Sequence, residues 1–73
     1  MLATKMEELL EKGYRIEFKP LDSLFQKKAR VKVRLAKDDY NVVDVIDLNT
    51  RHLENLLTFT LDGLAERYEV EHA

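Results

Sequence analysis

ARVKVRLAKDDYNVVDVIDL, residues 29–48, predicts two β-strands joined by a short polar turn. Over residues 29–35, valine and leucine alternate with arginine and lysine, which is typical of a strand with one buried and one exposed face. Residues 37–39, Lys-Asp-Asp, predict the turn of a hairpin. Residues 40–48 predict the next strand, but both of its faces are partly apolar. We therefore expect a β-bulge in this strand, or partial cover of its outer face.

An earlier strand is predicted immediately before this hairpin. Tyr14, Ile16 and Phe18 alternate with charged side chains, again with a period of two. Pro20 ends this strand, because proline has no N–H to donate to a neighbouring strand. The segment PLDSLFQKK, residues 20–28, predicts a loop between this strand and the hairpin.

A short helix is predicted over residues 5–12, before the first strand. Thr4 and Glu7 have the spacing of a capping box, in which each side chain accepts a hydrogen bond from the other residue's backbone N–H. Gly13 can adopt a positive φ and end the helix. The apolar residues of this segment recur at helical spacing, at Met6, Leu9 and Leu10.

A longer helix is predicted from an N-cap at Asn49 to about residue 70. At about 100° per residue its apolar side chains form one stripe, which is expected to face the core. The stripe consists of Leu53, Leu57, Thr60, Leu61, Leu64 and Tyr68, with Leu56 on its flank.

These elements predict an α+β fold in one domain, residues 1–73, with the order α-β-β-β-α. Two amphipathic helices, one N-terminal and one C-terminal, are available to pack on one face of a three-stranded antiparallel sheet. The core is expected to bring Leu57 and Leu64 together with Phe18 and Val33. The other face of the sheet is expected to carry Arg15, Glu17, Lys19, Arg30, Lys32 and Arg34.

Composition limits the class of protein. The 73 residues are 45% hydrophobic and 36% charged, which is typical of a folded globular chain. There is no cysteine, which excludes a disulfide framework and a thiolate zinc site and favours a cytoplasmic location. No apolar segment is long enough for a signal peptide or for a membrane helix of about 18 residues, so no membrane association is expected.

Positive charge is concentrated in residues 19–37, which hold seven basic side chains against one acidic one, whereas residues 38–73 hold two against nine. Lys27, Lys28, Arg30, Lys32 and Arg34 are therefore candidates for a nucleic-acid-binding face. The same pattern is also typical of the solvated face of an ordinary strand. No aromatic side chain lies among the outward residues to stack on bases, and Glu17 is placed to neutralise part of the charge.

Catalysis is not predicted. The sequence contains no glycine-rich phosphate loop and no nucleophile motif, and its two histidines are His52 and His72. Asp44 and Asp47 are three residues apart on a strand, so they point to opposite faces and form a poor carboxylate pair. We expect no enzyme activity, no cofactor and no metal.

Phe59 lies off the apolar stripe of the last helix, beside Leu56 and Gly63. A glycine in a helix interior costs about 1 kcal/mol relative to alanine and leaves room for another backbone to approach. The sequence therefore predicts a partner-binding ridge at Leu56, Phe59 and Gly63, which a second copy or another protein would cover. The alternative is that Phe59 packs inside the monomer and that Gly63 marks a kink.

Two comparisons with known families bear on function. The element order is shared with double-stranded-RNA-binding domains, but their Gly-Pro-x-His loop and lysine cluster are missing, so membership is rejected. The chain resembles small phage-encoded inhibitors, the type II-A anti-CRISPR proteins, over most of its length. The resemblance covers a short helix, EKGYRIEF at residues 11–18 as the helix exit into a strand, two further strands and a C-terminal amphipathic helix. It implies a phage protein that inhibits a macromolecular partner, with acidic residues of the C-terminal half occupying a DNA-binding surface.

The prediction from sequence is therefore a small non-enzymatic binding module that acts by protein–protein contact, with a homodimer as one form of that contact. The alternative is a nucleic-acid-binding domain that uses the basic face of the sheet.

Overall fold

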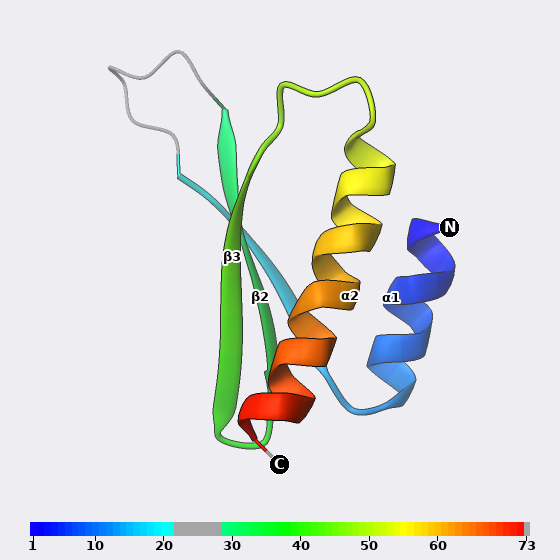
Figure 1. Cartoon of the computed structure of the whole chain (residues 1–73), viewed down its shortest axis with the longest axis vertical. Helices are drawn as coiled ribbons and strands as arrows, with labels where there is room; N and C mark the ends of the chain where they lie inside the picture. Colours follow the sequence, from blue (N-terminus) through cyan, green and yellow to red (C-terminus); the bar gives the residue numbers. More distant parts are fainter. Residues whose placement is uncertain (22–28, 73) are drawn as a thin grey trace.

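The computed structural model describes residues 1–21 and 29–72 and contains five regular elements (Figure 1). They are helix α1 (Leu2–Glu11), strands β1 (Arg15–Pro20), β2 (Arg30–Lys37) and β3 (Tyr40–Asp47), and helix α2 (Leu53–Glu71). The predicted α-β-β-β-α order is confirmed. Neither helix, within the described part of the chain, has the length and apolarity needed to cross a membrane.

The three strands form one antiparallel sheet in the order β1-β2-β3, so β2 is central. β2 and β3 form the predicted hairpin, with Asp38 and Asp39 in the turn and Asp38 at a positive φ of 57°. The register of this pair is unbroken from Lys37↔Tyr40 to Arg30↔Asp47. Of the two alternatives expected for β3, the bulge is therefore wrong. The apolar residues on the outer face of β3 are Val43 and Val45, which lie beside Arg34 and Lys32 on the side of the sheet away from the helices.

Both helices pack on the same face of the sheet, as predicted (Figure 1). Leu61 and Leu64 of α2 pack with Val33 and Leu35 of β2, and all four side chains are fully buried. The remaining buried members of the core are Leu9, Tyr14, Val31, Val42, Ile46 and Tyr68. This cluster combines α1, both strands of the hairpin and α2, so its formation requires these elements to assemble.

Phe18 does not belong to this core, contrary to the prediction. Its register partner is Val33, so the residue lies on the helix side of the sheet, yet 43% of it remains exposed. β1 is an edge strand, and Figure 1 shows its C-terminal end running away from both helices. The alternation of apolar and charged residues in β1 predicted the correct face of the sheet for Phe18. The helices, however, do not cover this face near the C-terminal end of β1.

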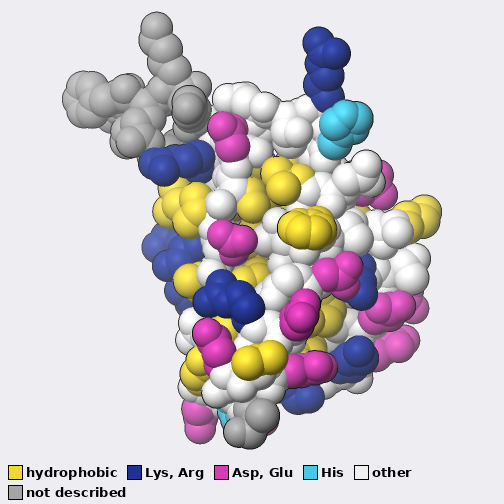
Figure 2. Space-filling model, viewed as in Figure 1, with side chains coloured by type: hydrophobic (Ala, Val, Ile, Leu, Met, Phe, Trp, Pro, Cys, Tyr) yellow, Lys and Arg dark blue, Asp and Glu magenta, His cyan; other side chains and the backbone are white. Residues whose placement is uncertain are grey.

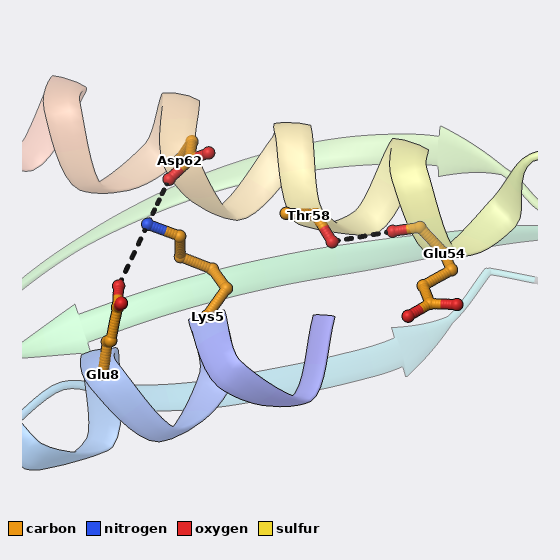
Figure 3. Close-up of polar contacts among 5 residues, drawn as sticks. All are labelled: Lys5, Glu8, Glu54, Thr58 and Asp62. Carbon is orange, nitrogen blue, oxygen red and sulfur yellow. Dashed lines mark hydrogen bonds and ion pairs between the residues drawn. The ribbon is translucent and has the colours of Figure 1, made fainter. Parts of the chain in front are cut away.

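α1 is held against α2 by polar contacts in addition to the buried Leu9 (Figure 3). The Lys5 ammonium lies 2.6 Å from a carboxylate oxygen of Asp62 in α2 and 3.2 Å from one of Glu8. The backbone N–H of Leu2 donates to Glu54 Oε1 at 3.4 Å. The partner of this first helical N–H therefore comes from α2, and the helix begins at Leu2 without a side-chain cap. The predicted capping box at Thr4 is wrong.

α2 also begins later than predicted, at Leu53 instead of just after Asn49. Asn49 belongs to the connection from β3, where its N–H donates to Asp47 Oδ1 at 2.8 Å. The His52 N–H donates to Thr50 Oγ1 at 3.2 Å in the same connection. These local turns use the polar side chains that resembled a helix cap in the sequence.

Candidate functional site

α2 is continuous through Gly63, and the predicted ridge runs beside its buried stripe, with Leu56 partly buried against the core. Thr60, Leu61, Leu64 and Tyr68 of the predicted stripe are buried, whereas Leu53 and Leu57 are only partly buried against the core. Phe59 lies on the other side and is 77% exposed. The alternative in which Phe59 packs inside the monomer is therefore wrong for the described residues.

Beside this ridge, a groove of about 710 Å³ runs between α2 and β3 and is lined mainly by apolar atoms. In Figure 2, which shows this side of the molecule, hydrophobic side chains are exposed between the strand and the helix with acidic side chains next to them. All three predicted ridge residues, Leu56, Phe59 and Gly63, line the groove. Val70 also lines it and is 76% exposed. The large exposed apolar side chains of α2 thus border one continuous hollow.

Gly63 leaves part of this hollow open. A Cβ placed on Gly63 would meet no atom within 4 Å. The helix therefore does not require glycine here for its own packing, although glycine is unfavourable in a helix interior. Its effect in the folded chain is to lower the helix surface between Phe59 and Val70.

The opposite wall of the groove is the free edge of β3. The Leu48 N–H donates to the Ala29 carbonyl at 2.9 Å, which continues the β2–β3 ladder. In an antiparallel pair the residues that exchange hydrogen bonds alternate with residues whose N–H and C=O point the other way. The backbone groups of Val43 and Val45 therefore point away from β2. No other strand of residues 1–21 and 29–72 pairs with that edge.

Side chains cover two of these outward backbone groups. Arg67 Nη1 of α2 donates to the Val43 carbonyl at 3.1 Å, across the groove. The Val45 N–H donates to Asp44 Oδ1 at 2.8 Å. Both contacts are made by exposed side chains, so each can exchange for water or for another partner at small cost. This partial cover is one way in which an edge strand avoids indiscriminate pairing.

The charge around the groove is mainly negative. Arg67 is the basic lining residue, and it lies 3.9 Å from Glu71 across one helical turn. The acidic lining residues are Asp44, Asp47, Glu66 and Glu71. An apolar groove with an acidic rim favours a partner that combines apolar and basic side chains.

The sequence did not predict Val70 or the acidic rim as part of this site. Val70 follows Phe59 by eleven residues, which is three turns of helix, so the helical period could have extended the ridge to it. Asp44 and Asp47 could not have been found in this way, because their position beside α2 depends on how the helix crosses the sheet.

The basic side chains of the alternative site lie on the opposite face of the sheet. Lys32 and Arg34 of β2 pair with Lys19 and Glu17 of β1, so these four side chains share the outer face, as predicted. Arg34 Nη1 lies 3.4 Å from Glu17 Oε2, the expected cross-strand neutralisation. Arg30 lies on the same face at the other end of β2. Lys27 and Lys28 lie outside the described residues.

The described residues contain no candidate metal centre. No group of three histidine, aspartate or glutamate side chains in that part of the chain is placed to hold a metal ion. His52 is exposed at the start of α2, and the His72 ring stacks on Tyr68 with 4.9 Å between ring centroids.

Comparison of the chain with protein-family models, with curated proteins and with solved structures finds no match in any of the three. The resemblance to anti-CRISPR proteins therefore stays a prediction.

Proposed function

We propose that the chain is a non-catalytic binding module that takes up a partner protein in the groove between α2 and β3. The observation that carries this proposal is the exposure of Phe59 and Val70 on one apolar groove. Large exposed apolar groups that cluster around a hollow are a feature of protein-interaction sites, whereas isolated ones are common on any surface. An aromatic side chain beside a pocket is also the usual anchor of an interface.

The proposed mode of action is occupation: the module covers a functional surface of its partner. The resemblance to phage-encoded inhibitors is compatible with this mode, and inhibition of a macromolecular partner is the form of the proposal that this resemblance favours. Phe59 would anchor the partner, Leu56 would support the Phe59 ring, and Gly63 would admit a partner group between Phe59 and Val70.

Affinity purification with the full chain as bait tests this proposal. The tagged parent chain is compared with Phe59→Asp and with Leu10→Asp, each incubated with nuclease-treated lysate from the source cells. Leu10 is a matched control because it is also an exposed apolar residue on a helix, on α1 away from the groove. We expect proteins that bind the parent and Leu10→Asp to be absent from the Phe59→Asp sample. Equal recovery with all three baits would contradict the proposal.

A second candidate function is nucleic-acid binding by the outer face of the sheet. It is favoured by a pocket of about 430 Å³ lined by Glu17, Phe18, Lys19, Lys32 and Arg34, of which three are basic residues. Replacing Arg30, Lys32 and Arg34 with glutamine should then weaken duplex binding and reduce its salt dependence by about 0.9 log units per lost phosphate contact. Absence of duplex and single-strand binding at low salt would exclude this function.

A further inference from the structure

We infer that the partner enters the groove as an extended segment whose α2-facing side chains are apolar and basic, and that this segment adds to the free edge of β3 as a fourth strand. This inference rests on the proposed function and specifies the chemistry of the partner. It follows from three features of the groove: the backbone of its wall, the shape of its floor and the charge of its rim.

The backbone of the wall favours a strand over a helix as the occupant. The N–H and C=O groups of Val43 and Val45 point out of the sheet, and they can be paired in series by another extended backbone. A helix uses its own backbone groups internally and would leave this edge unpaired. Strand addition at a free sheet edge supplies affinity through main-chain hydrogen bonds, while pockets for alternate side chains supply selectivity.

The floor of the groove fits alternate side chains of such a strand. A fourth strand would lie about 4.8 Å from β3, in the plane of the sheet. Every second side chain would then point toward α2 and contact the surface formed by Phe59, Gly63 and Val70, which is apolar. The open space at Gly63 would admit an aliphatic side chain there.

The rim selects the sign of the partner's charge. Asp44, whose register partner is the buried Val33, lies on the helix side of the sheet, and Glu66 and Glu71 belong to α2. A segment that carries lysine or arginine beside apolar residues in its α2-facing row would therefore gain favourable interactions. A second copy of this chain that pairs through its own β3 would instead bring the same acidic side chains to this edge. Antiparallel pairing of β3 with β3 of another copy, centred on Asp44, would place the two Asp44 side chains opposite each other, and like charges opposite each other destabilise a strand pair.

The test uses the full chain and synthetic nine-residue peptides of defined composition. The first peptide has threonine at every second position and both lysine and valine at the positions between, the second has glutamate in place of each lysine, and the third is the first with alternate backbone nitrogens methylated. Binding is followed by the amide NMR signals of the ¹⁵N-labelled protein. We expect the lysine–valine peptide to shift the signals of Val43, Val45 and Gly63. We expect the glutamate and methylated peptides to bind at least about tenfold more weakly, because repulsion or lost main-chain hydrogen bonds weaken them.

Variants of the protein give an independent readout. Val43→Pro removes an outward N–H, and proline is tolerated where the N–H of an edge strand faces solvent. Val43→Ala keeps this N–H and serves as its control. We expect Val43→Pro to lose the peptide and Val43→Ala to keep it, with both folds checked from the dispersion of their amide signals. If Val43→Pro fails to fold, the methylated peptide carries the same comparison on the parent chain.

Several results would overturn the inference. They are absence of binding by the lysine–valine peptide, equal binding by the glutamate peptide, or full binding by the methylated peptide. A dimer that sedimentation detects in the parent but not in Phe59→Asp would assign the groove to a second copy. The affinity purification can still recover proteins whose binding requires Phe59. In that case these results reject strand addition only, and the proposed function as a binding module stands.

Discussion

Leu64 is the residue at which the phase of α2 can be tested most directly. It is 1% exposed and packs in the centre of the core. Leu64→Ala should lower the free energy of unfolding by about 2–5 kcal/mol, because it removes buried methyl groups and leaves a cavity. Urea titration followed by circular dichroism measures this change. Leu10→Ala is the matched control, because Leu10 is largely exposed and alanine favours helix, so its effect should stay within about 0.5 kcal/mol.

Tyr68 predicts how stability depends on alkaline pH. Burial raises the pKa of its phenol above the usual 10.0, and nearby Asp38 raises it further. The neutral hydroxyl also donates to the Lys37 carbonyl at 2.9 Å. Because the folded pKa is higher than the unfolded one, this contribution to stability is fully present below pH 10.0 and is lost as the pH rises through the folded pKa.

We therefore expect the urea midpoint to be steady between about pH 7 and pH 9 and to fall above about pH 10. Tyr68→Phe should be less stable than the parent at neutral pH, since it lacks the hydrogen bond, but its midpoint should fall less steeply above that pH. Parallel curves for the two proteins would show that Tyr68 does not cause the alkaline loss. Tyr14 and Tyr40, whose pKa values burial also raises, would account for the residual slope.

At the scale of the element, α2 shows a conflict between helix propensity and the shape of the groove. Gly63→Ala should raise the free energy of unfolding by about 0.5–1 kcal/mol, because alanine favours helix and its methyl group meets no neighbour. Thermal and urea unfolding of the two proteins measure the gain. A loss of stability would mean that the space at Gly63 is occupied in the folded chain.

The same position separates stability from binding. Gly63→Leu should also fold as a helix, yet its side chain would project into the groove between Phe59 and Val70. Partner recovery in the affinity purification should therefore fall for Gly63→Leu while its unfolding midpoint stays at or above that of the parent. A variant that is more stable and less able to bind is the expected sign that the glycine serves the site.

At the scale of the whole molecule, one core cluster links α1, β2, β3 and α2. Small domains with a single core usually unfold in one cooperative transition. Far-UV circular dichroism, which follows the helices and the sheet, and tyrosine fluorescence should therefore give the same urea midpoint. The tyrosines suit this test because Tyr14 and Tyr40 contact Tyr68 from different parts of the chain, with 5.2 and 5.6 Å between ring centroids.

An early partial loss of the circular dichroism signal would contradict this expectation and would identify α1 as a separate unit. α1 is the shorter helix and adds only Leu9 to the fully buried cluster, so it is the element to examine. Leu9→Ala should lower both midpoints together if α1 unfolds with the rest of the molecule.

The sequence by itself determined the types, order and inward faces of the elements. The alternation of apolar and basic residues over 30–37 and the helical spacing of Leu57, Leu61 and Leu64 follow from local backbone geometry. Neither pattern depends on which element it packs against. The position of Phe59 off the apolar stripe was readable for the same reason. These properties depend only on the repeat of a helix or a strand.

Only the tertiary structure decided where the elements begin and end, and what each exposed residue faces. The N–H of Leu2 at the start of α1 donates to Glu54 of α2, and Phe18 remains exposed although it lies on the helix side of the sheet. Asp44 joins the groove because α2 runs alongside β3. Each of these features depends on contacts between residues far apart in the chain. The spacing of residues along the sequence does not determine how two elements are oriented where they pack together.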